Sequence, residues 1–298
     1  MTLRDLVQLA RPWQWSKNGI LFAGLIFSRN LTHPSFFMRS AAAFLLFCIA
    51  SSAIYMLNDA CDMERDRLHP MKRTRPLPSG RVSRGQVLAV TGVLLLVAVV
   101  GAWFLGRPFF LSMLAFLAVN ASYSFFFRNI VVLDAMLIAV SFVIRAVAGV
   151  MVLRPVEESI ELSPWLLVCT LFLALFLALG KRRHELGLLE THAAGHRASL
   201  GDYSRSLLDQ MISVVSAATL IAYAIYTIDP ATITKFGSRN LVITIPFVAY
   251  GIFRYLFLIQ ERNEGGNPSR ALYRDGPLLA TIASWLVVVV LVLYKARA

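Results

Sequence analysis

The chain has 298 residues, of which 57% are hydrophobic and only 15% are charged. Charged residues make up nearer a quarter of an ordinary soluble domain, so this composition excludes that class and indicates a polytopic membrane protein. The formal net charge of +12 fits basic cytoplasmic loops facing anionic lipid, so we expect no nucleic-acid partner.

Nine apolar stretches approach the roughly 20 residues that a membrane-spanning helix needs. They occupy residues 17–33, 37–57, 86–105, 108–127, 130–153, 164–180, 208–227, 240–259 and 277–295. The first stretch is the weakest, because Arg29 and Asn30 interrupt it. We therefore expect an all-α fold with nine transmembrane helices in a single domain, residues 1–298, and no separate soluble domain.

The basic residues are distributed unevenly between the loops. With the N-terminus in the cytoplasm, 19 Lys and Arg lie on the cytoplasmic side and 8 on the opposite side. Cytoplasmic loops carry the excess of Lys and Arg in membrane proteins. We therefore expect a multi-pass protein of the inner (plasma) membrane with a cytoplasmic N-terminus and with active-site loops 58–84 and 181–207 facing the cytoplasm.

The densest charged segment, NDACDMERDRLHPMKRTRP, follows the second stretch and covers residues 58–76. If the helix continues, Asn58, Asp62 and Asp66 share one face at i, i+4 and i+8, and Asp59 lies beside that face. Carboxylates at this spacing repel one another, which indicates that a cation offsets the repulsion. Hard oxygen ligands suit Mg²⁺, so we expect Asn58, Asp62 and Asp66 to hold it. Asp59, Asp62 and Asp66 are the expected catalytic residues.

Three bases follow the acids between prolines that favour turns: Lys72, Arg73 and Arg75. They could form salt bridges at the membrane surface or anchor lipid headgroups. Because the acids form a separate, regularly spaced face, the combined pattern favours Mg²⁺ together with a pyrophosphate whose remaining charge the bases meet.

The pattern N-D-x-x-D-x-x-x-D at the cytoplasmic end of the second span resembles the first aspartate-rich motif of the UbiA superfamily of intramembrane prenyltransferases. Members typically carry a second motif, D-x-x-x-D, after the sixth span. The corresponding segment here reads LGKRRHEL, residues 179–186, and no D-x-x-x-D occurs between residues 181 and 209. Bases thus stand where acids are expected, which favours a substrate with additional phosphate groups.

Four segments in chain order are similar to the decaprenyl-phosphate phosphoribosyltransferase branch of this superfamily. They are RPWQWSKN at 11–18, SAIYMLNDACDMERDRLHPMKRTRPLPSG at 52–80, IRAVAG at 144–149 and GKRRHEL at 180–186. The resemblance implies Mg²⁺-dependent transfer of 5-phosphoribose from phosphoribosyl pyrophosphate (PRPP) to a polyprenyl (decaprenyl) phosphate, releasing pyrophosphate. It places the reaction in the synthesis of a cell-envelope arabinose-donor lipid.

Two other functions remain as alternatives. A UbiA-type prenyltransferase would move a prenyl group from a prenyl diphosphate to an aromatic or other small acceptor. A transporter would distribute its ionisable residues along a path through the membrane, whereas most of these gather at one face. The expected partners are PRPP, a polyprenyl phosphate and the lipid bilayer, and the sequence leaves a homo-oligomer open.

Further substrate contacts are expected from polar residues at or near the cytoplasmic membrane surface. Arg145 lies mid-span, where an ionisable group usually faces a polar cavity, so we expect a phosphate contact; the alternative is a buried pair with Asp134. Lys17 is expected at the head group of the lipid acceptor, whereas Arg254 either contacts phosphate or extends to the surface. For the other expected substrate-binding residues, the alternative is a role at the membrane surface. The expected substrate-binding residues are Lys17, Asn18, Asn58, Lys72, Arg73, Arg75, Tyr123, Arg128, Arg145, Lys181, Arg182 and Glu185.

Overall fold

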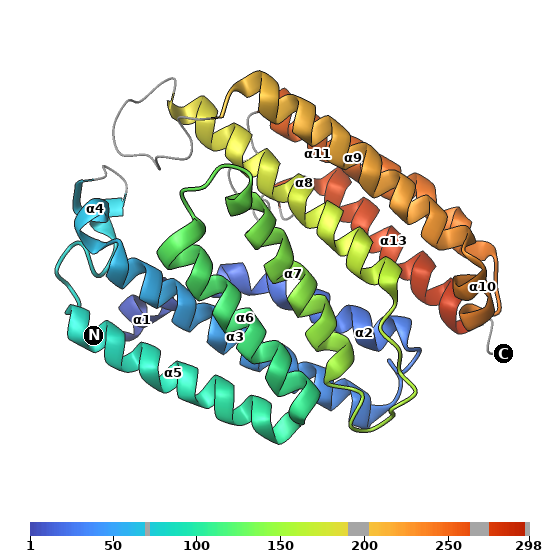
Figure 1. Cartoon of the computed structure of the whole chain (residues 1–298), viewed down its shortest axis with the longest axis horizontal. Helices are drawn as coiled ribbons and strands as arrows, with labels where there is room; N and C mark the ends of the chain where they lie inside the picture. Colours follow the sequence, from blue (N-terminus) through green and yellow to red (C-terminus); the bar gives the residue numbers. More distant parts are fainter. Residues whose placement is uncertain (69–71, 190–202, 263–273, 296–298) are drawn as a thin grey trace.

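The computed structural model describes residues 1–68, 72–189, 203–262 and 274–295, and the regular structure of these residues is entirely helical. The helices are α1 (Leu3–Ala10), η1 (Pro12–Leu21), α2 (Phe22–Phe27), α3 (Pro34–Cys61), α4 (Met63–Leu68), η2 (Lys72–Thr74), α5 (Arg84–Leu105), α6 (Arg107–Ser122), η3 (Tyr123–Phe127), α7 (Leu133–Met151), α8 (Pro164–Leu189), α9 (Arg205–Ile228), α10 (Pro230–Phe236), η5 (Asn240–Thr244), α11 (Ile245–Gln260) and α13 (Gly276–Lys295). Figure 1 shows α1 and α4 near one end of the bundle and α10 and the C-terminus near the other.

Local sequence determines where several helices begin. Before α5, the Ser83 hydroxyl accepts from the Gln86 N–H at 3.2 Å, and the Gln86 side chain accepts from the Ser83 N–H at 3.1 Å. This reciprocal cap satisfies two backbone donors that a helix N-terminus leaves unpaired. Thr2 and Asp5 form the same arrangement at α1. Helix α3 begins with Pro34, whose missing N–H costs nothing in a first turn.

Eight helical segments of the described chain are long and apolar enough to cross a membrane. They match the second to ninth expected stretches, with boundaries that differ by a few residues except where α8 continues beyond its stretch to Leu189. The first expected stretch differs, because η1 is a 3₁₀ helix that runs directly into the short helix α2, and a turn with Arg29 at φ +61° follows. From the rise of each helix type, η1 and α2 together extend about 29 Å, close to the thickness of a hydrocarbon core.

Helix α7 connects the two halves of the core. On one side, α3, α5, α6 and α7 enclose a cluster in which the ring of Phe47 lies 5.8 Å from Phe109 and 4.9 Å from Phe116. On the other side, α7, α8, α9 and α11 enclose a second cluster, in which Phe176 and Tyr255 pack edge to face at 5.4 Å. These two apolar clusters therefore share helix α7, and two smaller clusters, around Met56 and around Tyr226, lie beside them.

The segment η1–α2 lies in backbone contact with α7. A Cβ atom at Gly149 would come within 2.1 Å of the Leu21 carbonyl oxygen, and one at Gly24 within 2.3 Å of the Gly149 carbonyl oxygen. Only glycine permits this approach. The glycines thereby fix the position of η1, which carries Lys17 and Asn18.

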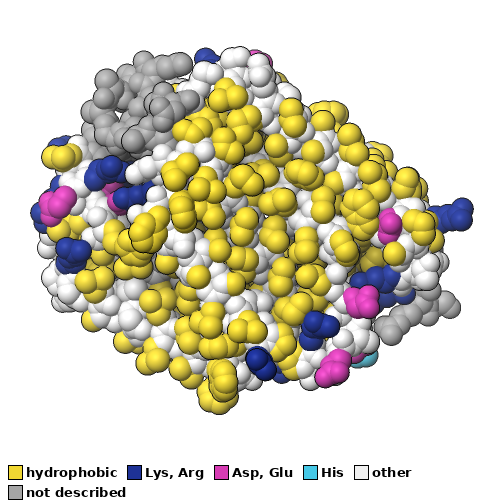
Figure 2. Space-filling view, viewed as in Figure 1, with side chains coloured by type: hydrophobic (Ala, Val, Ile, Leu, Met, Phe, Trp, Pro, Cys, Tyr) yellow, Lys and Arg dark blue, Asp and Glu magenta, His cyan; other side chains and the backbone are white. Residues whose placement is uncertain are grey.

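The outer surface agrees with a membrane-embedded body. Figure 2 shows hydrophobic side chains over most of one face, while Lys, Arg, Asp and Glu gather at two opposite ends of the molecule. Large apolar side chains such as Trp103 and Phe104 of α5 are 62% and 80% exposed. Such exposure is energetically unfavourable in water but not in lipid.

Candidate functional site

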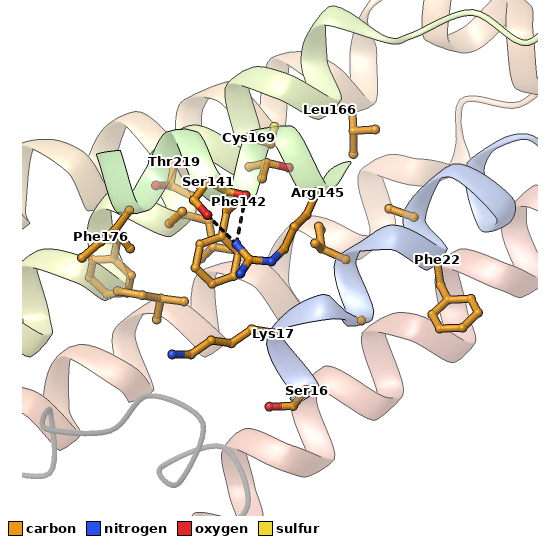
Figure 3. A pocket seen from close by; sticks show the side chains of 18 of the residues that line it. Ser16, Lys17, Phe22, Ser141, Phe142, Arg145, Leu166, Cys169, Phe176 and Thr219 are labelled. Carbon is orange, nitrogen blue, oxygen red and sulfur yellow. Dashed lines mark hydrogen bonds between the residues drawn. The ribbon is translucent and has the colours of Figure 1, made fainter. Parts of the chain in front are cut away.

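One large cavity, of about 2060 Å³, runs through the bundle. At the end near α4 it is lined by polar and charged side chains, including Asn58, Asp59, Asp62 and Asp66 from the segment that the sequence singled out. Its central part is lined mainly by apolar side chains, and Figure 3 shows Phe22, Phe142 and Phe176 there with Lys17 and Arg145. The cavity therefore combines a polar end with a long apolar interior.

The acidic motif lies at the junction of α3 and α4. A continuous helix was expected here, but α3 ends at Cys61, Asp62 caps it at φ −93° and ψ 6°, and α4 begins at Met63. The i to i+4 hydrogen bonds persist across the break, from Asp62 N–H to the Asn58 carbonyl at 2.9 Å and from Asp66 N–H to the Asp62 carbonyl at 2.8 Å. The break therefore leaves Asn58, Asp62 and Asp66 all facing the cavity.

Two of the carboxylates are bridged by basic residues. Arg75 reaches both Asp59, at 3.2 Å, and Asp66, at 2.7 Å. Lys72 lies 3.5 Å from Asp66, and Arg11 lies 2.5 Å from Asp59. The predicted bases Lys72 and Arg75 thus stand beside the predicted acids. Arg11 was not among the expected site residues, although it begins the quoted segment RPWQWSKN, where a charge beside interfacial tryptophans could have drawn attention to it.

The third carboxylate has a partner from elsewhere in the chain. Arg128, which follows the π-helix η3, lies 2.8 Å from Asp62. Tyr123 and Ser124 of the same π-helix also line the cavity. Such π-helical insertions occur often at functional sites. The structure thus brings Arg128 to the acidic motif and Tyr123 to the lining of the same cavity, and their contacts with substrate stay predictions.

The motif offers oxygen ligands that fit Mg²⁺. The Asn58 Oδ1 atom is buried and has no hydrogen-bond partner among the described residues. Together with the carboxylates of Asp62 and Asp66, it supplies the hard oxygen donors that Mg²⁺ prefers. In the described part of the chain no three His, Cys, Asp or Glu side chains converge on one point. Mg²⁺ usually takes only one or two carboxylates and adds phosphate and water, so this donor set is sufficient.

Helix α8 supplies the opposite wall. Lys181 and Glu185 line the cavity and lie 3.4 Å apart, whereas Arg182 does not line it and is only 1% exposed. Arg182 lies 2.7 Å from the fully buried Asp134 and 2.5 Å from Glu185, and its Nη2 donates to the Tyr123 hydroxyl at 3.3 Å. We infer that Arg182 positions two cavity-lining residues from behind.

Tyr203 completes this buried network. Its hydroxyl donates to Asp134 Oδ1 at 3.1 Å and accepts the Val132 N–H at 2.7 Å. Burial raises the pKa of Tyr203 to about 12, so the hydroxyl keeps its proton near neutral pH. Val132 has an unusual φ of +68°, which this hydrogen bond helps to hold. Tyr203, two residues before α9, is thereby tied to the start of α7.

Arg145 lies inside the bundle and is 6% exposed. Its Nε donates to Asn18 Oδ1 at 2.8 Å, and its Nη1 donates to the carbonyl and hydroxyl oxygens of Ser141 at 2.9 and 2.8 Å (Figure 3 marks the Ser141 contacts). The alternative of a buried pair between Arg145 and Asp134 is wrong, because Asp134 pairs with Arg182. Asn18 therefore orients Arg145 and does not itself line the cavity.

Two other basic residues lie away from the cavity lining. Arg73 is exposed on η2. Arg254 forms a two-point ion pair with Asp275, at 3.1 and 2.7 Å, which joins α11 to the start of α13. The expected loop 181–207 falls partly outside the described residues, as do residues 69–71 of loop 58–84.

Comparison with known proteins adds to this geometry. The UbiA prenyltransferase family matches residues 20–276 of the chain. The chain belongs to the UbiA family. Its acidic motif, its π-helix and the whole of α8 fall within the matched range, whereas Arg11, Lys17 and Asn18 precede it.

Curated relatives in the UbiA family match over nearly the whole chain. The decaprenyl-phosphate phosphoribosyltransferase of Mycolicibacterium smegmatis is 32% identical, over 94% of this chain and 90% of its own length. The protein of the same name from Corynebacterium glutamicum is 30% identical, over 97% of this chain and 86% of its own length.

A solved structure shares the fold. A UbiA homologue from Archaeoglobus fulgidus, bound to GPP and Mg²⁺, has a TM-score of 0.71 and 18% identity, covering 97% of this chain and 99% of that one. At this identity the likeness establishes the UbiA fold alone, and the chemistry of this chain has to be argued from its own residues.

Proposed function

We propose that this UbiA-family protein catalyses Mg²⁺-dependent transfer of 5-phosphoribose from PRPP to a polyprenyl phosphate, with release of pyrophosphate. The observation that carries the proposal is the composition of the cavity's charged end. One acidic motif, Asn58 to Asp66, faces Lys181 and Glu185 on α8, where a second acidic motif would be expected. The names of the curated relatives support the same activity.

The reaction is a substitution at C1 of the ribose. The bond between C1 and the pyrophosphate oxygen breaks, and a bond forms between C1 and an oxygen of the lipid phosphate. The lipid phosphate is already anionic near neutral pH, so it can attack without a general base. Catalysis then consists of holding two anions together and neutralising the leaving group. The residues at the charged end are suited to both tasks.

We assign the roles as follows. Asn58, Asp62 and Asp66 hold Mg²⁺, which when bound neutralises charge on the pyrophosphate. Arg75 and Lys72 exchange their carboxylate partners for pyrophosphate oxygens. They can do so because a phosphate oxygen accepts the same charge-assisted hydrogen bonds as a carboxylate.

Other residues of the cavity position the donor or supply positive charge to its phosphates. Asp59 supports the acidic face, and Arg128 lies at the α3–α4 junction. Tyr123 lines the same cavity, and Lys181 meets a further phosphate of the donor from the α8 wall. Arg73 is the expected contact with the least support, since it does not line the cavity.

The membrane arrangement follows from the same elements. We propose nine spans, with η1 and α2 together forming the first, and a cytoplasmic N-terminus in the inner (plasma) membrane. One domain, residues 1–298, then carries its active-site loops, 58–84 and 181–207, at the cytoplasmic face where water-soluble PRPP is available. The apolar part of the cavity would hold the prenyl chain, and the product would enter synthesis of an arabinose-donor lipid of the cell envelope.

The test uses the purified full chain with Mg²⁺, labelled PRPP and a polyprenyl phosphate. We expect label to enter the organic phase, with one pyrophosphate released per labelled lipid and no transfer in EDTA. The competing function is a UbiA-type prenyltransferase, tested with a prenyl diphosphate and an aromatic acid. Reaction of that pair without any transfer from PRPP would overturn the proposal.

A further inference from the structure

Lys17 and Arg145 line the central part of the cavity without a salt bridge to a carboxylate among the described residues, as do Arg65 of α4 and Lys235 of α10 nearer its two ends. Most bases nearer the acidic motif differ in this respect, because Arg75, Arg128 and Lys181 each lie within salt-bridge distance of an acid. The charged neighbours of Lys17 are all positive, namely Lys181, Arg145 and Arg11. This part of the cavity therefore carries net positive charge.

Neutral groups hold the Arg145 guanidinium in place. Asn18 and Ser141 accept from Nε and Nη1, and the guanidinium carbon lies 4.5 Å from the ring centre of Phe116 and 5.2 Å from that of Phe142. The second amino group, Nη2, has no hydrogen-bond partner within the described ranges. A buried charge held only by neutral groups keeps a high electrostatic free energy unless an anion joins it.

The surroundings of these two cations restrict the anion that fits. Figure 3 shows Lys17 and Arg145 directed into the cavity beside apolar side chains, including Phe22, Leu166 and Phe176. The fitting ligand has one compact anionic group joined to a long apolar chain, as in the monophosphate of a polyprenol. A pyrophosphate on a ribose lacks the apolar part and has its own bases near Asp59 and Asp66.

We propose that Lys17 and Arg145 bind the phosphate of the lipid acceptor, apart from the acidic motif that takes the donor's pyrophosphate. The inference rests on the proposed function and identifies which bases serve the acceptor. Asn18 acts as a positioning residue, because it aims Arg145 from outside the cavity. The lipid phosphate then reaches C1 of the donor from the side of Lys17 and Arg145, while the acidic motif and its bases hold the pyrophosphate. Separate positive groups for the two anionic substrates limit their mutual repulsion.

Binding of farnesyl phosphate, measured by titration calorimetry without Mg²⁺ or PRPP, tests the site directly. Each bond to a charged group is typically worth a few kcal/mol, so we expect Lys17→Gln and Arg145→Gln to weaken binding about 10- to 100-fold. Arg254→Gln is the matched control, since Arg254 pairs with Asp275 away from the cavity lining, and it should bind as the wild type does. Wild-type affinity in Lys17→Gln would overturn the proposal.

Lys17 makes the decisive variant because its side chain has no hydrogen bond or salt bridge to another described residue. Its loss therefore breaks no contact that holds the fold, whereas Arg145 connects α7 to η1 and its variant could fail to fold. Thermal melting of Lys17→Gln in detergent should match the wild type.

Competition experiments separate the possible sources of the phosphate. Farnesol and inorganic phosphate should each compete weakly, because each lacks one half of the recognised structure. Equal competition by phosphatidic acid would indicate a general headgroup site and overturn the assignment to the acceptor.

The proposed function and this inference fail in different ways. If the wild type transfers nothing from PRPP but binds farnesyl phosphate through Lys17, the proposed function fails and the anionic-lipid site stands. If transfer occurs and Lys17→Gln leaves the KM for the lipid phosphate unchanged, the inference alone fails.

Discussion

The backbone contact between Gly149 and Leu21 gives a sharp test of how the cavity is built. In Gly149→Ala the new Cβ would lie 2.1 Å from the Leu21 carbonyl oxygen, where an ordinary contact is 3.4 to 4 Å. Backbone atoms cannot rotate away, so η1 and α2 must move from α7 by about 1 Å. Asn18 lies one 3₁₀ turn before Leu21, so its 2.8 Å bond to Arg145 lengthens and Lys17 moves with it.

The expected cost is large for activity and moderate for stability. A displacement of about 1 Å at a positioning element can lower the rate about 100-fold, whereas overpacking typically costs about 1–3 kcal/mol of folding free energy. We expect kcat/KM for polyprenyl phosphate to fall by about that factor in Gly149→Ala while the protein still melts cooperatively.

Gly92→Ala is the matched control for this substitution. Gly92 lies in α5, and a Cβ there meets nothing within 4 Å, so activity should be unchanged. Wild-type kcat/KM in folded Gly149→Ala would refute the reasoning that this contact positions η1.

Three further predictions follow from individual side chains. Asp62→Asn should lower Mg²⁺-dependent turnover about 100-fold or more, since it removes a charged ligand, and PRPP transfer assays across a Mg²⁺ titration would measure this. Asp134→Asn removes the fully buried partner of Arg182 and leaves only the partly exposed Glu185 as its counter-charge, which should cost about 2–3 kcal/mol, seen as a lower melting temperature. The hydrogen bond from Arg254 lowers the pKa of the Asp275 carboxyl, so the unfolded chain binds more protons in acid. This contribution is complete above the unfolded pKa of about 4 and is lost as pH falls, and Asp275→Asn should flatten that part of a melting profile.

Each of these predictions has a control. Cys61→Ala changes the exposed neighbour of Asp62 and should leave turnover intact, while an unaltered Mg²⁺ response in Asp62→Asn would remove the metal role. Asp209→Asn breaks a more exposed pair with Arg183 and should cost about 1 kcal/mol or less, so an equal loss in both variants would contradict the argument from burial. A melting profile of Asp275→Asn that parallels the wild type in acid would exclude the linkage.

The sequence predicted the features that depend on local pattern. Long apolar runs identify eight of the spans because the bilayer imposes a minimum length on each. The spacing of Asn58, Asp62 and Asp66 predicted a shared face. That face survives the break at Asp62 because the i to i+4 backbone hydrogen bonds continue across it. Such features require no knowledge of which helices are neighbours.

Long-range pairing could not be predicted in this way. Asp134 and Arg182 are 48 residues apart, and nothing in the sequence indicates that Arg182 turns away from the cavity to meet that carboxylate. Arg11 and Asp59 are likewise 48 residues apart. The close contact of η1 with α7 is also long-range, and neither this contact nor the 3₁₀ form of η1 can be read from hydropathy, which shows only a weak, interrupted span.

The shared guanidinium of Arg75 has a consequence for the order in which ligands arrive. Because Arg75 already pairs with Asp66, one of the proposed Mg²⁺ ligands, a lone divalent ion has to compete with a covalently tethered cation for that carboxylate. A pyrophosphate that arrives with its metal gives the Arg75 guanidinium a new anionic partner when the guanidinium releases its carboxylates. The number of ion pairs is therefore conserved. Under the proposed function, the acidic motif therefore disfavours free metal and accepts the metal and the donor together.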